Sequence, residues 1–247
     1  GTLDSYYAGQ HIGEIWGFRT EGFFKDKNDI QTSASQRQIA SNIGTHPIEP
    51  GDLKFADLNH DGIISYENRT LEKHGDAVVI GNSSDRYPYS MLLNLDWIGF
   101  DISLFFQGIG KKDYWPAANN HYFWGVYAQP WANVLKSNMD HWTPENPNGY
   151  FPRPKAYVAS ANWVEAACPN DRYLQDASYC RLKNLTIGYT FPQTWSKKIR
   201  FKKLRLFFSG ENLALITKLC KNLDPEGLEG MAYPFQKTFS IGINCDF

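Results

Sequence analysis

The sequence predicts an all-β protein whose antiparallel strands cross a membrane as part of a barrel. Three observations support this fold class: apolar and polar residues alternate at the end of the chain, a hairpin is encoded in its middle, and short and long connections are sorted along it. The mean hydropathy of −0.47 does not argue against a membrane location, because a barrel strand is apolar on only one of its two faces.

The end of the chain, residues 235–247, alternates between apolar and polar residues. Successive side chains of a strand point to opposite faces, so one face of this segment is apolar, interrupted only by Lys237. At about 3.3 Å per residue the strand is roughly 40 Å long, which is enough to cross a bilayer at the tilt of about 45° typical of barrel strands. Its apolar face is formed by Phe235, Phe239, Ile241, Ile243, Cys245 and Phe247.

A two-residue turn at Ile98 and Gly99 predicts a hairpin of residues 88–98 and 100–110. Directly opposed residues of a hairpin share a face, and this turn places one group of large apolar side chains together. The opposite face is mixed, and pairs Asp96 with Asp101. The apolar group consists of Met91, Leu93, Leu95, Trp97, Phe100, Ile102, Leu104 and Phe106.

Two more strands are predicted at 178–191 and 202–213, which gives five with the hairpin and the last segment. The connections after residues 97 and 191 are short, whereas those before 91, after 106 and after 212 are long. If the chain runs up and down, all short turns fall at one end of the sheet and all long loops at the other. Outer-membrane barrels have this polarity, with short periplasmic turns and long extracellular loops.

The alternative is a soluble, secreted β-sandwich that binds carbohydrate and carries a dockerin-like calcium loop. Strands of such a sandwich alternate in the same way, so alternation alone does not separate the two interpretations. The sandwich would bury the apolar face between two layers, whereas the barrel turns it toward lipid.

The other segments are predicted to lie outside the barrel wall. We expect residues 1–87 to form one segment and 88–247 the strand region, with 14–23 extended and 24–50 a loop. A long tract at 111–177 has little periodicity, and a structureless loop of that length is uncommon. Its aromatic residues either bind a ligand, by stacking on sugar rings or by contact with a partner protein, or they pack the loop against itself or a neighbouring loop. These residues include Tyr114, Trp115, Tyr122, Phe123, Trp124, Tyr127, Trp131, Trp142 and Trp163.

Residues 57–68 follow the D-x-N-x-D-G spacing of an EF-hand calcium loop. Oxygen atoms at loop positions 1, 3, 5, 7 and 12 suit a hard cation that needs six or more oxygen ligands. Position 12 is an asparagine instead of the usual bidentate glutamate, and Glu67 sits one residue early, which favours weak, extracellular-type binding. An Asx-rich turn that binds nothing is the alternative. The predicted structural Ca²⁺ ligands are Asp57, Asn59, Asp61, the backbone carbonyl of Ile63, and Asn68.

Composition excludes several classes of function. A formal net charge of −1 gives no basis for nucleic-acid binding, and no apolar run is long enough for a transmembrane helix. The four cysteines lack the spacing of a zinc site and allow three disulfide pairings between which the sequence does not choose. No histidine is paired with a nucleophile at a meaningful spacing, so we expect no catalytic residues and no enzymatic activity. The histidines are His11, His46, His60, His74, His121 and His141.

Several stretches resemble the C-terminal part of SusC/RagA-type TonB-dependent outer-membrane transporters, in order and over nearly the whole chain. The stretch 15–23 resembles the family's segment upstream of the calcium-like loop, and the terminal Phe247 resembles the signal recognised by barrel-assembly machinery. The remaining stretches are Gly51–Gly62, Ile98–Gly108, Arg181–Thr190, Ser209–Leu213, Tyr233–Pro234 and Thr238–Asn244.

The resemblance implies a plugged barrel of about 22 strands that imports glycans or peptides. It also implies a SusD-like surface lipoprotein as a lid, energy from TonB, and an outer-membrane location in a Bacteroidetes-like Gram-negative bacterium. The chain would then supply the last strands and several extracellular loops, with a periplasmic C-terminus. Plug, TonB-contacting segment and early strands would belong to a preceding portion. The chain departs from the family at Asn68, where an acidic ligand is usual, and at Cys180, Cys220 and Cys245.

Overall fold

The computed structural model describes residues 2–39, 47–128, 133–154, 167–196, 198, 200–228 and 235–246. They form two compact units, which we call the loop unit (1–84 and 113–175) and the sheet unit (85–112 and 176–247). The boundary predicted between residues 87 and 88 stays a prediction. No helix in the described residues is long and apolar enough to cross a membrane.

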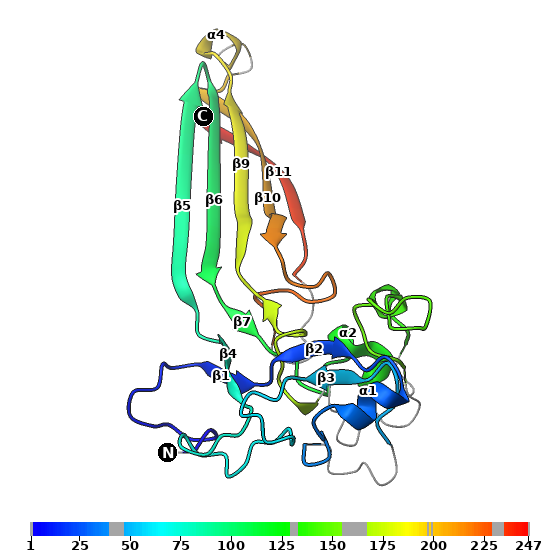
Figure 1. The fold of residues 1–247 in the computed structure, drawn as a ribbon. Helices are drawn as coiled ribbons and strands as arrows, with labels where there is room; N and C mark the ends of the chain where they lie inside the picture. Colours follow the sequence, from blue (N-terminus) through cyan, green and yellow to red (C-terminus); the bar gives the residue numbers. More distant parts are fainter. Residues whose placement is uncertain are drawn as a thin grey trace. The chain divides into compact units, whose positions relative to one another are not determined.

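The sheet unit contains one antiparallel sheet of five strands in the order β11-β10-β9-β6-β5 (Figure 1). The short helix α4 (Gln193–Ser196) lies between β9 and β10, at the same end of the sheet as the β5–β6 turn (Figure 1). This confirms the prediction of five antiparallel strands. The strands are β5 (Arg86–Trp97), β6 (Phe100–Lys111), β9 (Tyr179–Thr190), β10 (Lys203–Thr217) and β11 (Thr238–Asp246).

Strand ends differ from the prediction mainly in the last two strands. β10 continues to Thr217, past the predicted end at 213, and β11 begins at Thr238 instead of 235. Tyr233, Pro234 and Phe247, which carried part of the family resemblance, lie outside the described residues.

The β5–β6 hairpin has the predicted turn and register. Both turn residues have positive φ, 43° at Ile98 and 84° at Gly99, as a type I′ turn requires. Trp97 pairs with Phe100, and the register continues without a shift to Met91 opposite Phe106. A β-branched residue at positive φ is strained, so the matching twist of the two strands must outweigh this local cost.

The register carries the apolar alternation across all five strands. One row of directly paired residues is entirely apolar: Leu95, Ile102, Ile187, Phe208 and Ile241. The next row is entirely small and polar: Asn94, Ser103, Thr186, Ser209 and Ser240. Because paired residues share a face, the sheet has one apolar and one polar face.

The apolar face is open in the part of the chain that the structure describes. Ile241 is 78% exposed, and Met91, Leu95, Trp97 and Ile243 are also more than half exposed. The five strands form a single layer, so the buried interior that a sandwich requires is not found among the described residues. The soluble sandwich is therefore the weaker interpretation.

The loop unit combines short strand pairs with short helices. β1 (Glu14–Gly17) pairs with β4 (Val78–Asn82), and β2 (Thr20–Phe23) pairs with β3 (Leu53–Phe55), so residues 14–23 are mostly extended as predicted. Predicting only loop for 24–50 was wrong at α1 (Lys27–Thr32), where the Asp26 carboxylate caps the helix by accepting from the Asp29 N–H at 2.8 Å. The remaining elements of the loop unit are β7 (Asp113–Tyr114), α2 (His121–Trp124), η1 (Gly125–Tyr127) and η2 (Lys136–Met139), and the boundary between the two units falls within β8 (Gln175–Asp176).

Aromatic residues of the 111–177 tract form the core of the loop unit. The Tyr127 and Tyr173 rings both stack on Phe151, with ring centroids 5.4 and 5.9 Å away. Trp124 is fully buried and donates from Nε1 to the Pro116 carbonyl at 3.0 Å. Of the two interpretations of this tract, packing of the loop against itself therefore holds for these residues. Trp131 and Trp163 lie outside the described residues.

Candidate functional site

The sheet unit presents two chemically different faces, and these are the first candidate functional surfaces. The apolar rows leave large side chains exposed over the sheet, as a surface in contact with lipid requires. On the polar face the Arg205 guanidinium pairs with the Asp101 carboxylate through Nε at 2.8 Å and through Nη2. The sheet can therefore separate lipid on one side from a polar interior on the other.

The loop that follows β10 and contains Asp224 and Glu226 is held to the polar face by ion pairs with β9. Arg181 is 3% exposed and donates from Nη2 to both carboxylate oxygens of Asp224, at 2.6 and 2.7 Å. Its Nε lies 2.6 Å from Glu226, an ion contact without the alignment of a hydrogen bond, and Lys183 also binds Glu226. The Phe235 ring lies 5.1 Å from the Arg181 guanidinium. Sequence analysis missed this cluster, because no local pattern links residues 181 and 224.

The calcium-like loop has the backbone geometry that its motif predicts. The Asp57 Oδ2 atom accepts from the Gly62 N–H at 2.9 Å, and Gly62 has a φ of 80°. Asn59 Oδ1 accepts from the Asp61 N–H at 3.0 Å, and Asp61 Oδ1 accepts from the Ile63 N–H at 2.7 Å. The three side chains predicted as ligands, those of Asp57, Asn59 and Asp61, therefore all accept from backbone N–H groups within one turn.

The loop's neighbours hold its two ends together. Asp76 is fully buried, and its two oxygens accept from the backbone N–H groups of Leu58 at 2.8 Å and Ser65 at 3.0 Å. Ile64, also fully buried, donates its N–H to the Ser35 carbonyl at 2.9 Å. Asp76 is a structural residue that sequence analysis missed, since it lies outside the motif.

The residues after the loop are fixed by stacking and charge. Arg69 pairs with both oxygens of Asp4 at 2.7 and 2.8 Å, and its guanidinium lies 4.4 Å from the Tyr66 ring. The hydrogen bond from Arg69 lowers the pKa of Asp4, and burial raises the pKa of Tyr66 well above its usual range. The ion pair between Arg69 and Asp4 and the Arg69–Tyr66 contact therefore link the end of the loop to the N-terminal segment.

The donors fit a divalent cation in part. Asp57 Oδ1 is buried and has no hydrogen-bond partner among the described residues, as expected of an atom reserved for a ligand. Asn68 is exposed, whereas the Glu67 carboxylate reaches the Asn59 side-chain amide at 3.4 Å. Within the described ranges, no three His, Cys, Asp or Glu side chains gather closely enough to hold a metal. Calcium binding at Asp57, Asn59, Asp61, Ile63 and Asn68 stays a prediction.

The described histidines and cysteines form no catalytic arrangement. His11 contacts Glu14 at 3.3 Å, the His74 ring lies 5.6 Å from the Trp16 ring, and His141 Nδ1 meets the Asn138 carbonyl at 3.1 Å. The four cysteines are free thiols. His46 lies outside the described residues.

Comparison with known proteins identifies the class to which this sheet belongs. No family model matches the chain. TonB-dependent receptor P26 of Formosa agariphila is 30% identical over 97% of the chain, and receptor P3 of the same organism is 28% identical over 97%. SusC of Bacteroides thetaiotaomicron is 25% identical over 73%. The chain spans 23%, 22% and 18% of the lengths of these relatives, respectively.

Solved structures agree in fold. The RagAB peptide transporter superimposes with a TM-score of 0.57 at 20% identity, over 96% of this chain and 23% of the other. RagAB in its open-open state gives 0.59 at 16% identity, over 98% of this chain and 24% of the other. The chain belongs to the SusC/RagA-type TonB-dependent receptors. Receptors of this family are outer-membrane proteins, which agrees with the strand-rich sheet unit.

Proposed function

We propose that the protein to which this chain contributes is an outer-membrane importer that depends on TonB. In this proposal the sheet unit is part of the barrel wall, with its apolar face toward lipid and its polar face toward the interior. The observation that carries the proposal is the apolar row of five paired residues that ends at Ile241, which is 78% exposed. Such a row across a single layer suits lipid better than water.

The orientation follows from the connections of the sheet unit. The β5–β6 turn and the β9–β10 connection lie at the same end of the sheet, and this end also carries the last residues of β11 (Figure 1). Outer-membrane barrels place short turns on the periplasmic side, so we propose a periplasmic C-terminus and extracellular loops.

The imported nutrient is proposed to be a glycan or a peptide, and a SusD-like surface lipoprotein the partner that covers the barrel. The name SusC among the relatives and the RagAB peptide transporter among the similar structures support this class of cargo and partner. TonB would act on a portion of the protein that precedes this chain, so no energy coupling is assigned to these residues.

Uptake by whole cells tests the import proposal. Cells that carry the complete receptor are expected to accumulate a fluorescent oligosaccharide or peptide pool, and cells lacking either the receptor or TonB are not. Fractionation is expected to place the receptor in the outer membrane. Equal accumulation with and without the receptor, for all pools, would contradict import.

We also propose that the loop 57–68 binds calcium as a structural ion. Asp57, Asn59 and Asp61 would supply side-chain oxygens, Ile63 its carbonyl and Asn68 the last position. With two carboxylates in the motif, the dissociation constant is expected at about 0.1–1 mM, as in extracellular modules. Isothermal titration of the complete receptor tests this, with the variant Asp57→Asn as control. No heat at millimolar calcium would remove the proposal.

A further inference from the structure

The loop unit contains an open groove of about 760 Å³ that neither the barrel wall nor the calcium-like loop uses. Its volume is in the range of sites for small ligands, which is about 300–1,000 Å³. Three prolines, Pro50, Pro144 and Pro147, make much of its wall rigid. The remaining lining comes from Glu21, Gly22, Phe23, Lys25, Asp26, Lys27, Trp142, Asn148 and Arg172.

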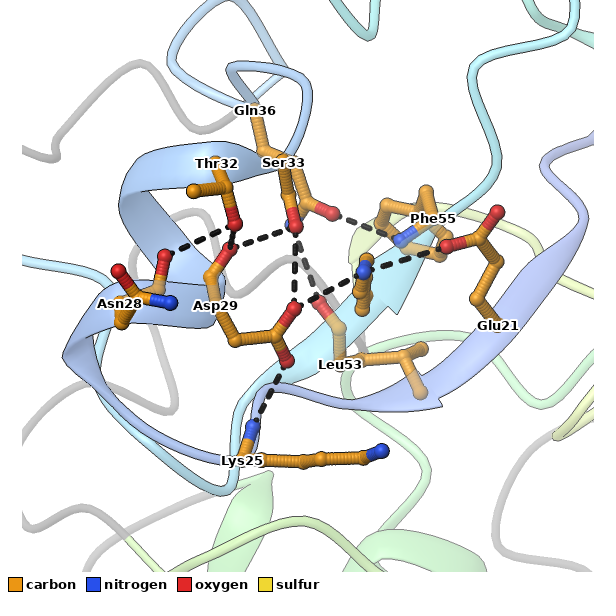
Figure 2. Close-up of polar contacts among 10 residues, drawn as sticks. Glu21, Lys25, Asn28, Asp29, Thr32, Ser33, Gln36, Leu53 and Phe55 are labelled. Atoms are coloured by element: carbon orange, nitrogen blue, oxygen red, sulfur yellow. Dashed lines mark hydrogen bonds and ion pairs between the residues drawn. The ribbon is translucent and has the colours of Figure 1, made fainter.

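The carboxylates beside the groove are already engaged within the protein. Figure 2 shows the Asp29 carboxylate accepting from the Lys25 backbone N–H at 3.0 Å. The other Asp29 oxygen binds the Lys54 ammonium at 3.1 Å, and the same ammonium lies 3.4 Å from Glu21. The N–H from Lys25, and then Lys54, hold the pKa of Asp29 below its usual range. Asp26 caps helix α1.

The cations of the groove, by contrast, have no carboxylate against them in the described part of the chain. The Lys25 side chain leads away from the Asp29 carboxylate in Figure 2, and neither Lys25 nor Lys27 forms an ion pair with a described residue. Arg172 donates to the neutral carbonyls of Gly149 at 2.7 Å and Tyr150 at 3.0 Å. The groove lining therefore has three cations, Lys25, Lys27 and Arg172, and two carboxylates, Glu21 and Asp26, so its net charge of +1 can be balanced by an anionic ligand.

The aromatic side chains of the groove do not offer open ring faces. Phe23 and Trp142 are each 9% exposed, and the Arg172 guanidinium lies 4.5 Å from the centre of the Phe23 ring. A sugar ring binds aromatic residues by stacking on an exposed face, so this groove suits a sugar poorly. The cations Lys25, Lys27 and Arg172 along the groove instead suit an acidic ligand that needs no ring stacking, such as an extended peptide with carboxylate side chains.

We infer that this groove binds a short acidic peptide in an extended conformation, with its carboxylates on Lys25, Lys27 and Arg172. The exposed Asn148 amide at the rim carries both donors and an acceptor for the backbone of the peptide. The inference concerns equilibrium binding at the groove and does not depend on passage through a barrel. Failure of import would therefore leave it standing, and its own failure would leave import standing.

Fluorescence anisotropy with a labelled peptide of alternating glutamate and proline residues tests the inference on the complete receptor in detergent. The double variant Lys25→Glu/Lys27→Glu is expected to weaken binding by roughly tenfold or more, because each reversal replaces attraction by repulsion. The matched control is Lys73→Glu, an exposed lysine of the loop unit outside the groove, with an expected change below about twofold. Binding is also expected to weaken at high salt.

Two further comparisons locate the site and the ligand class. Asn148→Trp should fill the groove and weaken binding of the acidic peptide. A peptide with glutamine in place of each glutamate should bind much more weakly than the acidic peptide. The inference is overturned if the acidic and glutamine peptides bind equally, if Lys73→Glu weakens binding as much as the double variant, or if the acidic peptide does not bind. Tighter binding of oligogalacturonate would also overturn it, in favour of an acidic glycan.

Discussion

The loop unit and the sheet unit use the same apolar residue types in opposite ways. Trp124 in the loop unit is fully buried among other aromatic rings, whereas Trp97 in the sheet unit is 71% exposed. The loop unit buries Phe123, Trp124, Tyr127, Phe151 and Tyr173 in one aromatic core, whereas the sheet unit leaves a broad apolar face uncovered in the described residues. The difference shows that the loop unit has an interior of its own, while the apolar face of the sheet unit is not covered by any of the described residues.

The two units also differ in where their polar side chains lie. In the loop unit buried polar side chains serve the backbone: Gln36 accepts from the Phe55 N–H at 2.7 Å and donates to the Leu53 carbonyl at 3.0 Å. In the sheet unit the polar side chains are gathered on one face, where Arg205 meets Asp101. The segregation agrees with the proposed barrel wall, in which polar residues would line a water-filled lumen.

Truncation inside the loop unit should have the largest effect. Trp124→Ala removes a fully buried indole and its hydrogen bond to Pro116, and is expected to destabilise the loop unit by about 3–5 kcal/mol. Limited proteolysis of the complete receptor measures this as faster cleavage within 113–175. The matched change in the sheet unit, Trp97→Ala, should leave that cleavage rate unchanged. An equal increase of the cleavage rate in Trp124→Ala and Trp97→Ala would contradict the difference between the two units.

A charge on the apolar face of the sheet should have the next largest effect. Ile241→Arg is expected to destabilise the receptor in a bilayer by about 2–4 kcal/mol if the residue lies near the midplane, because an arginine there must leave water. Ser240→Arg, one residue away on the polar face, should cost much less. Urea titration in lipid vesicles compares the two. A penalty for Ser240→Arg that equals that for Ile241→Arg would contradict the assignment of faces.

Removal of the buried Asp76 carboxylate should have the third-largest effect on stability. Asp76→Ala leaves the N–H groups of Leu58 and Ser65 without their acceptor in a buried setting, at an expected cost of about 2–3 kcal/mol to the loop 57–68. Hydrogen exchange at Ser65 measures the loss directly. Glu72→Ala, which removes an exposed carboxylate outside the loop, serves as control, and unchanged exchange in Asp76→Ala would contradict the structural role of Asp76.

The smallest effect should be a pH dependence at α1. The pKa of Asp29 is lowered in the folded state, first by the Lys25 N–H and then by Lys54. The stabilisation that the Asp29 carboxylate gives to α1 is therefore fully present above the unfolded pKa of about 3.9. It is lost as pH falls below that value through the folded pKa. Hydrogen exchange of the Lys25 amide, corrected for its intrinsic rate, should become faster over this range. The corresponding loss in the free energy of protection is expected to be less than about 1 kcal/mol. Asp29→Asn should remove the dependence, and a dependence of the same size in that variant would contradict it.

Local patterns were sufficient to predict the five strands of the sheet unit, although not all of their ends. The hairpin follows from alternation and a turn that lies within two residues, so its register could be read from adjacent positions. The extension of β10 to Thr217 could not, because a register shift between Glu211 and Ala214 interrupts its pairing with β9. Alternation fails at such a bulge, because the extra residue is left unpaired.

The loop unit was harder to predict because distant segments determine it. Helix α1 is short and carries no apolar stripe, so only its cap at Asp26 marks it. Asp76 acts on Leu58, and Arg181 in the sheet unit acts on Asp224, over sequence separations that no spacing rule covers. The groove likewise needs Phe23, Trp142 and Arg172 from three separate segments. The calcium motif was visible because all its proposed ligands lie within one stretch.

Spin labels along β11 test the orientation of the sheet most directly. In a cysteine-free receptor reconstituted in lipid vesicles, nitroxides placed singly at residues 239–244 report contact with lipid-soluble oxygen or with a water-soluble nickel complex. Phe239, Ile241 and Ile243 are predicted to be accessible to oxygen, and Ser240, Gly242 and Asn244 to nickel, with a period of two residues. Protection of Phe239, Ile241 and Ile243 from both reagents would show that protein covers them and would contradict the membrane-facing sheet.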